Sequence, residues 1–278
     1  MQVGFSLLAA FFAGAADFCG GLAAKKTPVL SVTLVSQLTG LVLLAIALPF
    51  FPEPSFPSDY LWAALGGVCG VSGLGLLYHA LSIGKMGVVS PVTAVLAAAV
   101  PVIVATALGQ HLAVLQVIGI LFALVAIALI SFSFEDGVRE FSTRGLKEAA
   151  ASGIVLSGWY LFLAHTHRES ALHTLIAARV ASVAFVALLG IGARTNLRPQ
   201  RETLSYILLS GILDITASAF FLFATFSGAL AIAAVLTSLY PASTVFLARV
   251  ILRERLGLTQ WFGVAFALVG VALIALRR

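Results

Sequence analysis

The chain has 278 residues, a length typical of one or two soluble domains, but its composition excludes that class. Hydrophobic residues make up 61% of it and charged residues 10%, whereas a soluble domain carries about 25% charged residues. The mean hydropathy is +1.10. Soluble enzymes and DNA-binding domains are therefore excluded. The net charge of +5 indicates basic loops on one side of a membrane, and no nucleic-acid partner is expected.

Ten apolar stretches follow one another along the chain, each near the 20 or so residues that a membrane-crossing helix needs. They occupy residues 3–24, 29–51, 59–83, 87–109, 112–132, 145–165, 171–193, 203–225, 228–252 and 257–276. Turn-forming and charged residues separate them, as in the proline-rich stretch 52–57 and the Glu135-Asp136-Gly137 joint. Because the joints are short, the sequence predicts an all-α polytopic membrane protein without a soluble domain.

The sequence contains no signature of a cofactor, metal or nucleotide site. Cys19 and Cys69 both lie in apolar stretches, which indicates neither a disulfide framework nor a metal site. On a helix, His165 and His167 would point to different sides, so we expect no metal between them. A GxxxxGK[ST] loop for ATP is also missing from the sequence. We therefore expect no cofactor.

An internal repeat links the two halves of the chain at a constant offset of 144 residues. Residues 108–130 and 252–274 are identical at eleven of 23 positions. The matched pairs include Gln116/Gln260, Gly119/Gly263, Phe122/Phe266 and, further upstream, Gly67/Gly211. Chance similarity between two apolar helices explains shared Ala, Leu and Val, but not Gln, Gly and Phe matched at one offset over several spans. The sequence therefore predicts a duplication.

Each repeat contains five predicted spans, and an odd number makes the second copy enter the membrane from the opposite side. We therefore predict ten transmembrane helices as two inverted five-helix repeats, residues 1–134 and 145–278. The loop charges support this interpretation. The first loop carries Lys25 and Lys26, whereas its counterpart in the second repeat carries Arg168 beside Glu169. Corresponding loops thus have opposite bias, as copies on opposite sides should.

Basic residues also predict the orientation in the membrane. Twelve Lys and Arg residues lie in the odd-numbered loops, against three on the opposite side. The positive-inside rule then places the odd-numbered loops in the cytoplasm and both termini outside it. We expect an integral protein of a bacterial inner membrane.

The second half of each repeat resembles the EamA-type families of the drug/metabolite transporter superfamily. The residues that carry the resemblance are Tyr240-Pro241, Leu252-Arg253-Glu254-Arg255-Leu256, Gln260-Trp261-Phe262-Gly263 and Gly270-Val271. The first copy departs from this pattern, with Ala97 in place of Pro241 and Gln110 in place of Glu254. The resemblance covers essentially the whole chain and implies a ten-helix secondary transporter, often an exporter of metabolites, amino acids or drug-like solutes. No substrate-defining motif carries over.

Two other classes of protein compete with a transporter: a polytopic membrane enzyme and a structural or partner-binding membrane subunit. An enzyme needs a convergent nucleophile or metal cluster, and the sequence has no HExxH, GxSxG or clustered acidic motif. An inverted repeat with charges inside its spans favours transport over both. The expected partners are then a small-molecule solute, the lipid bilayer and, in one interpretation, a coupled proton. The substrate, the direction of flux and the oligomeric state are left open by the sequence.

Three charged residues lie inside predicted spans, where a charge is costly: Asp17, Arg179 and Asp214. Helical spacing places both aspartates on faces rich in small residues, which indicates that they point inward. One interpretation is proton coupling, since burial disfavours a charged carboxylate. Another is recognition of a substrate carboxylate or phosphate by Arg179. The structural alternative is an ion pair of Arg179 with Asp214 or Asp17.

Other side chains extend this candidate site. Gln37 aligns with Arg179 at an offset of 142, so each half has a polar group at the same depth. Trp159 and Tyr240 are aromatic residues that either pack or line the substrate route. We expect spans one, three, six and eight to surround a central cavity near the membrane midplane. The predicted substrate-binding or coupling residues are Asp17, Gln37, Trp159, Arg179, Asp214 and Tyr240.

Two further features have a structural interpretation. The third span presents a face of small residues, which is more often a packing surface than a binding surface. Its members are Gly66, Gly67, Cys69, Gly70, Ser72, Gly73 and Gly75. The Arg253-Glu254-Arg255 cluster at the end of the ninth span is interpreted as an interfacial anchor and helix cap.

Overall fold

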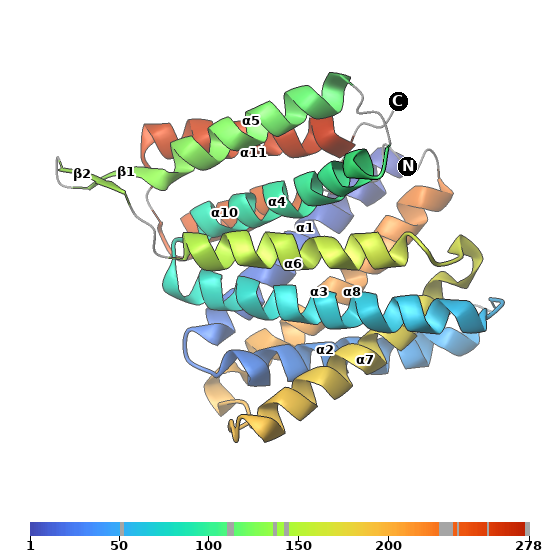
Figure 1. Cartoon of the computed structure of the whole chain (residues 1–278). Helices are drawn as coiled ribbons and strands as arrows, with labels where there is room; N and C mark the ends of the chain where they lie inside the picture. The colour runs from blue at the N-terminus through green and yellow to red at the C-terminus, as the bar shows by residue number, and fades with distance from the viewer. Residues whose placement is uncertain are drawn as a thin grey trace.

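The computed structural model describes residues 1–50, 53–109, 114–135, 138–141, 145–227, 236–237, 239–254 and 256–275. This part of the chain forms ten α-helices and one β-hairpin (Figure 1). The first half contains α1 (Gln2–Ala24), α2 (Val29–Ala47), α3 (Pro57–Ile83), α4 (Met86–Ala107) and α5 (Val114–Ser131). The second half contains α6 (Leu146–Leu163), α7 (Ala171–Gly192), α8 (Arg201–Phe226), α10 (Tyr240–Ile251) and α11 (Leu258–Ala275). Short 3₁₀ turns, η1 (Leu48–Phe50) and η2 (Arg168–Ser170), precede α3 and α7.

These helices confirm the predicted all-α polytopic fold, with two local differences. Helix α2 ends at Ala47, before the predicted residue 51, because Pro49 cannot continue an α-helix and a 3₁₀ turn takes its place. Between the two halves, β1 (Phe132–Glu135) and β2 (Val138–Phe141) form an antiparallel hairpin that was not expected. Residues 228–235 and 238 of the predicted ninth span lie outside the described residues, and the helix described there begins at Tyr240.

Five of the helical segments are long and apolar enough to cross a membrane, counting only the described residues: Gln2–Ala24, Val29–Phe50, Pro57–Ile83, Ala171–Gly192 and Arg201–Phe221. Two shorter apolar segments are Met86–Pro101 and Leu258–Leu273. The outer surface of the helices carries exposed large apolar side chains, such as Val42, Leu188 and Ile191. Such a surface suits lipid rather than water. The chain is therefore an integral membrane protein.

Helix contacts follow a two-fold pattern that relates the two repeats. Helix α1 packs on α8 as α6 packs on α3, and α2 packs on α8 as α7 packs on α3. Three helices contact their own counterparts, in the pairs α2/α7, α4/α10 and α5/α11. Helix α1 starts at the end of the molecule opposite the hairpin, whereas its counterpart α6 starts beside the hairpin (Figure 1). The counterpart helices thus run in opposite directions, as inverted repeats require.

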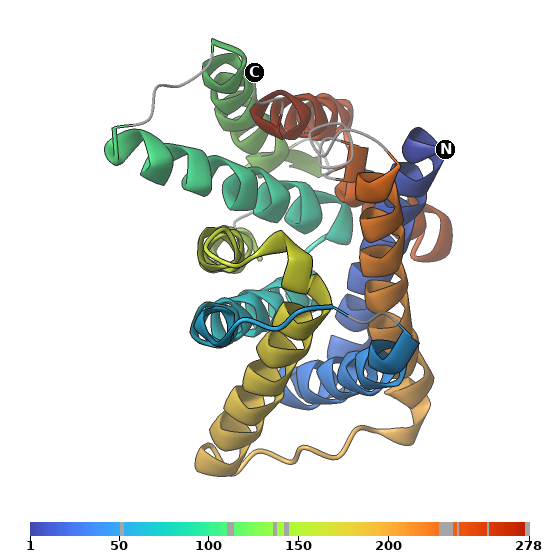
Figure 2. The ribbon, with the colours of Figure 1, turned by 90° about the vertical axis from the view of Figure 1, so that its right-hand side faces the viewer.

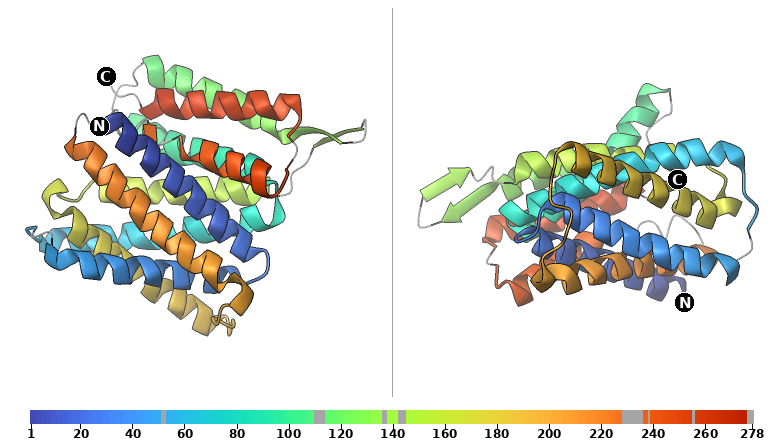
Figure 3. Two further views of the ribbon diagram at one scale, coloured as in Figure 1. Left: turned by 180° about the vertical axis from the view of Figure 1, so that it is seen from behind. Right: turned by 90° about the horizontal axis from the view of Figure 1, so that it is seen from below.

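Eight of the described helices form two four-helix bundles, and each bundle contains two helices from the first repeat and two from the second. The α3/α6 bundle contains α3, α4, α6 and α7, and the α1/α8 bundle contains α1, α2, α8 and α10. In Figure 2, α1 and α8 run side by side on the right, α3 and α6 are seen end-on on the left, and α5 and α11 lie together at the top. Figure 3 (left) shows α1 and α8 side by side along most of their length. Contacts between the bundles include those of α2 with α7, α1 with α3, α4 with α10 and α2 with α3.

The four largest fully buried side chains lie at the end of the molecule that carries the hairpin. Leu81, Met86, Ile207 and Val32 are the largest fully buried side chains. They lie at the end of α3 and near the starts of α4, α8 and α2, all of which are at the hairpin end (Figure 1). The start of α1 and the end of α11 lie at the opposite end.

Duplicated glycines explain how the crossing helices approach so closely. A Cβ atom on Gly67 of α3 would lie 2.8 Å from the backbone carbonyl carbon of Ala178 in α7. At the matched Gly211 of α8, a Cβ atom would lie 2.6 Å from the backbone oxygen of Ser36 in α2. Real Cβ atoms do not approach other atoms so closely, so only glycine fits either crossing. The small-residue face of the third span is thus a packing surface at this point, as expected.

Candidate substrate site between the two bundles

Arg179 of α7 reaches across from the α3/α6 bundle to two residues of the α1/α8 bundle. One guanidinium nitrogen donates a hydrogen bond to the side-chain oxygen of Gln37 in α2, and another forms an ion pair with Asp214 of α8. The Arg179 side chain is 11% exposed, whereas that of Asp214 is 42% exposed. The third guanidinium nitrogen, Nε, is buried without a hydrogen-bond partner. Within the pair, the arginine side chain is therefore nearly buried and the aspartate side chain is partly exposed.

Asp17 lies on α1, close enough to Asp214 for the two carboxylates to interact electrostatically. It also interacts with three tyrosines, Tyr78, Tyr160 and Tyr240. Its side chain is partly exposed and forms neither a hydrogen bond nor an ion pair within the part of the chain that the structure describes. Arg179 has thus paired with one of the two candidate aspartates and left the other unpaired.

Tyr78 joins the two bundles one turn away from Asp17. Its ring fills the space in front of Gly20, where a Cβ atom would lie 2.6 Å from the Tyr78 hydroxyl oxygen. The Ser210 hydroxyl donates to the backbone oxygen of Ala16, 2.9 Å away, so it accepts a hydrogen bond from the Tyr78 hydroxyl, also 2.9 Å away. Because Tyr78 is 2% exposed, this contact closes the hairpin side of the site.

Tyr160 and Tyr240 lie on the other side of Asp17. Tyr160 belongs to α6 and is 53% exposed although it interacts electrostatically with both Asp17 and Tyr240. Tyr240 begins α10, and its backbone lies against Gly14 of α1. Tyr160 is the most exposed of the three tyrosines that interact with Asp17.

The structure brings Asp17, Gln37, Arg179, Asp214 and Tyr240 together between the bundles. Trp159, the sixth predicted residue, lies against Gly70 of α3, inside the α3/α6 bundle. Its neighbour Tyr160 takes the place near Asp17. Tyr78 and Tyr160 were not among the predicted site residues. A signal for Tyr160 exists in the repeat, because it stands 143 residues after Asp17, close to the duplication offset.

A second buried carboxylate, Asp59 at the start of α3, lies outside this site. It is 2% exposed and accepts hydrogen bonds from the Ser170 hydroxyl at 2.5 Å, the His167 backbone N–H at 3.1 Å and His167 Nδ1 at 2.8 Å. At the equivalent place in the second repeat, Thr203 bonds to Thr27 at 2.6 Å. The first contact ties the start of α3 to the loop before α7, and the second ties the start of α8 to the loop after α1. Each contact therefore lies inside a single bundle, the first in the α3/α6 bundle and the second in the α1/α8 bundle.

Glu254 caps the start of α4, a different helix, and not the end of its own span as predicted. Its carboxylate accepts hydrogen bonds from the backbone N–H groups of Met86 at 3.0 Å and Gly87 at 3.1 Å, in the first turn of α4. A carboxylate at a helix N-terminus satisfies free N–H groups and favours the helix dipole. Among the described residues, no group of three or more His, Cys, Asp or Glu side chains is placed to hold a metal ion.

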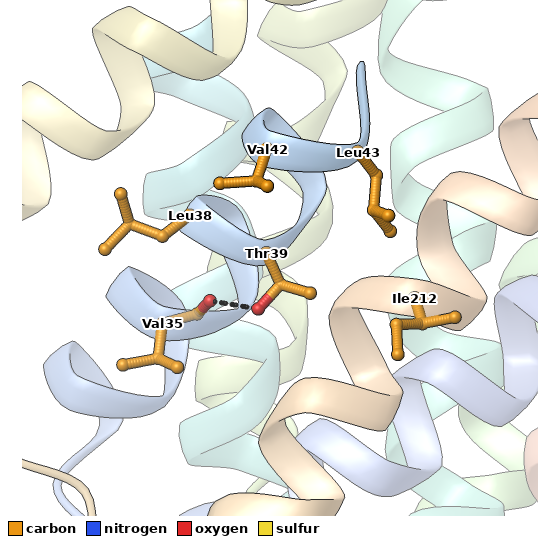
Figure 4. Close-up of a pocket in the computed structure, with 6 residues that line it drawn as sticks. All are labelled: Val35, Leu38, Thr39, Val42, Leu43 and Ile212. Atoms are coloured by element: carbon orange, nitrogen blue, oxygen red, sulfur yellow. Dashed lines mark hydrogen bonds between the residues drawn. The ribbon is translucent and has the colours of Figure 1, made fainter. Parts of the chain in front are cut away.

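An apolar hollow lies on the outer face of α2 and α8, away from the charged site (Figure 4). It is lined by Val35, Leu38, Thr39, Val42, Leu43 and Ile212. The Thr39 hydroxyl donates to the backbone oxygen of Val35 at 2.8 Å, which leaves the lining apolar. A surface hollow of this kind suits lipid chains rather than a polar solute.

An all-helical membrane protein with two matching repeats and charged residues between its bundles has the architecture of many secondary transporters. The sequence profile described as the EamA-like transporter family matches residues 2–132 and, separately, residues 145–276. The chain therefore belongs to the EamA-like transporter family and is a membrane transporter of the drug/metabolite superfamily.

Several solved structures are similar to this chain, and one of these crystal structures covers 97% of this chain and 96% of its own length, with a TM-score of 0.59. The two chains share 18% identical residues, so this likeness shows the fold alone. No curated protein matches the chain.

Proposed function

We propose that the protein is a secondary transporter that moves a small solute by alternating access, with the Arg179–Asp214 pair at the interface that opens and closes. The observation that carries the proposal is the place of this pair. Arg179 belongs to the α3/α6 bundle, and both of its partners belong to the α1/α8 bundle. A relative movement of the bundles must therefore lengthen or break these contacts.

The distribution of hydrogen bonds supports two bundles that move as units. Ties within a bundle are numerous: Ser182 to Gly67, Ser152 to Gly73, Thr93 to Ala149, Thr244 to Gly14 and Thr27 to Thr203. Besides Arg179, the side-chain hydrogen bonds that join the described parts of the bundles include Tyr78 to Ser210, and the Glu254 cap joins α4 to the segment after α10. Packed units with few polar links between them favour rigid-body movement.

The Arg179–Asp214 pair gives such a movement a chemical trigger. A proton on Asp214 removes its charge and weakens the pair, and a substrate carboxylate or phosphate competes with Asp214 for the guanidinium. The Asp214 side chain is 42% exposed, which leaves room for either species beside it. In this proposal, proton or solute binding changes the relative stability of the two bundle arrangements, which is the requirement for coupling.

The orientation follows from the loop charges. Lys25, Lys26, Lys85, Arg194 and Arg198 lie in loops at the hairpin end, where the core is tightly packed. If these loops face the cytoplasm of a bacterial inner membrane, both termini lie outside and the structure represents a state closed to the cytoplasm. The repeats 1–134 and 145–278 would then be inverted relative to each other across the membrane.

Counterflow in proteoliposomes tests the proposal. Purified protein is reconstituted and loaded with a panel of metabolites, amino acids and amines, and uptake of the same labelled compounds is measured. We expect at least one solute to exchange, and we expect the isosteric Asp214→Asn variant to lose most of that exchange. Glu202→Gln is the matched control, because it removes an exposed carboxylate on the same helix. No exchange of any compound, or full exchange with unchanged pH dependence in Asp214→Asn, overturns the proposed role.

A further inference from the structure

The apolar hollow on the outer face of α2 and α8 lies beside a close approach of these two helices (Figure 4). Ile212, its lining residue from α8, follows Gly211 directly, and a Cβ atom on Gly211 would lie 2.8 Å from the Cβ atom of Thr39 in α2. The Leu38, Val42 and Ile212 side chains in the lining are exposed. The hollow is therefore open toward the lipid along two packed helices.

Polar contacts join the starts of the same two helices at the hairpin end of the molecule. Lys26 Nζ, after α1, lies 3.3 Å from the carboxylate of Glu202 in the first turn of α8. The Ser31 hydroxyl, in the first turn of α2, donates a hydrogen bond to the backbone oxygen of Leu197 at 2.9 Å. These contacts hold the loop between α1 and α2 against the loop that leads into α8.

The corner formed by these two loops, residues 25–31 and 197–203, is basic. Its basic residues are Lys25, Lys26, Arg198 and Arg201. Its one acidic residue, Glu202, is paired with Lys26. The side chains of Lys25, Arg198 and Arg201 are exposed and form no ion pair with any described residue. The corner therefore presents three uncompensated positive charges to an anionic partner.

The basic corner and the hollow follow each other in depth along the same helices. Arg201 and Ile212 lie on one face of α8, because eleven residues make about three helical turns, and Ile212 is about 16 Å beyond Arg201. On α2, Val35 and Val42 lie about 9 and 20 Å beyond the helix start at Val29. Half of the hydrocarbon layer is about 15 Å thick. The hollow thus has the depth of the acyl chains of one leaflet, with the basic corner at the level of their headgroups.

We infer that this surface binds one anionic phospholipid of the bilayer, with its phosphate at Arg198 and Arg201 and an acyl chain in the hollow between α2 and α8. A guanidinium offers two parallel N–H donors, which match two phosphate oxygens. The lining suits a hydrocarbon chain, since its one hydroxyl, that of Thr39, donates to the backbone of its own helix at 2.8 Å. The inference is independent of the proposed function, because it concerns the outer face and not the charged site.

A lipid at this place binds to the two helices that supply the partners of Arg179. Gln37 belongs to α2 and Asp214 to α8. The same two helices also meet at Gly40, where a Cβ atom would lie 3.2 Å from the Ile215 side chain and 3.7 Å from the Arg179 guanidinium carbon. A lipid that bridges α2 and α8 therefore stabilises the helix pair that positions both partners of Arg179.

Lipid titration followed by native mass spectrometry tests the inference. The purified full chain in detergent is titrated with phosphatidylglycerol and, separately, with phosphatidylcholine that has the same acyl chains. We expect one phosphatidylglycerol molecule to bind about 5- to 25-fold more tightly, since each basic side chain near a membrane surface gives about a fivefold gain in affinity for anionic lipid. Glycerol 3-phosphate, which has the charge without the acyl chains, should not compete at the same concentration. Equal binding of the two lipids, or competition by glycerol 3-phosphate, overturns the inference.

Charge variants locate the headgroup. Arg198→Gln and Arg201→Gln should each weaken phosphatidylglycerol binding about fivefold and leave phosphatidylcholine binding unchanged. Lys147→Gln is the matched control, because Lys147 is an exposed basic residue at the start of α6, in the other bundle. An equal loss of binding in Lys147→Gln would show a general attraction of lipid to basic loops and overturns the assignment.

A second pair of variants locates the acyl chain. Val42→Trp fills the hollow and should weaken the binding of both lipids roughly tenfold, the loss expected when about two methylene groups lose their contacts. Leu188→Trp places the same side chain on the exposed face of α7 and should change neither affinity. Both positions are exposed, so both variants should fold. Unchanged lipid binding in Val42→Trp overturns the assignment, and so does a dimer of the chain that Val42→Trp separates, because a second copy then covers the hollow.

Discussion

Gln37 and Arg179 hold corresponding positions in the two repeats, and the Arg179 guanidinium donates a hydrogen bond directly to the Gln37 side-chain oxygen. Phe122 and Phe266, another matched pair, stack with ring centroids 5.0 Å apart. Both pairs lie on helices that contact their own counterparts, α2 with α7 and α5 with α11. At the axis that relates two repeats, a residue meets its own copy. At this position the two copies differ, and the contact is a polar one between Gln and Arg.

Removal of Asp214 and removal of Arg179 should lower the free energy of unfolding by different amounts. Asp214→Ala strands a guanidinium that is 11% exposed, and breaking a buried pair in this way costs about 3–5 kcal/mol. Arg179→Ala strands a carboxylate that reaches solvent, so its cost should be closer to 1–2 kcal/mol, the loss of a charged hydrogen bond. Thermal unfolding in detergent measures both. Equal destabilisation by the two substitutions would show that Asp214 is as enclosed as Arg179.

The glycine crossings predict a contrast within one helix. Gly67→Ala places a methyl group against the backbone of Ala178, and such overpacking costs about 1–3 kcal/mol. Gly75→Ala, on the same helix, meets nothing closer than the Val29 side chain at 3.8 Å. That control should be neutral or stabilising by about 0.5–1 kcal/mol. Gly211→Ala should behave like Gly67→Ala, and a stable Gly211→Ala protein would contradict the close approach of α8 to α2.

Asp59 should contribute more to stability than Thr203, its counterpart in the second repeat. Asp59→Ala removes the acceptor of three hydrogen bonds from His167 and Ser170, so we expect a loss of about 3–5 kcal/mol. Thr203→Val removes one hydroxyl contact to Thr27 and should cost about 1 kcal/mol. Unfolding temperatures of the purified variants give the comparison. The prediction fails if Thr203→Val is the more harmful change.

The proposed orientation predicts opposite signals from two reporters. A reporter that is active only in the cytoplasm should stay dark when it is fused to the C-terminus. The same reporter inserted in the hairpin between β1 and β2 should be bright, because that hairpin lies at the end with the basic loops. A bright C-terminal fusion, or a dark hairpin insertion, would reverse the orientation.

Accessibility at the site should differ between Tyr160 and Tyr78. In a background without Cys19 and Cys69, a thiol reagent that cannot cross membranes should label Tyr160→Cys from outside, since this residue is 53% exposed. Tyr78→Cys should be protected, because Tyr78 is buried between Gly20 and Ser210. Labelling of both variants from the same side would show that the hairpin end does not close the site.

The sequence alone identified the helices, the duplication and the charged residues. Helices and charges are visible in a short stretch of sequence, and a duplication is visible when one half of the sequence is compared with the other. An apolar run of sufficient length forms a helix in a membrane whatever it packs against. A constant offset of 144 residues reveals a repeat without any knowledge of the fold. Two local features also carry sequence signals. Pro49 predicts the end of α2, and the alternation of apolar and polar residues in 132–135 predicts the first strand of the hairpin.

Only the tertiary structure decided which helices form a bundle and which aspartate pairs with Arg179. In water, an apolar face marks the side of a helix that packs inward. In a membrane, the faces toward lipid and toward neighbouring helices are both apolar, so helix sequences carry little information about their partners. For this reason, the exchange of helices between the repeats and the pairing of Arg179 with Asp214 rather than Asp17 appear only once the helices are packed.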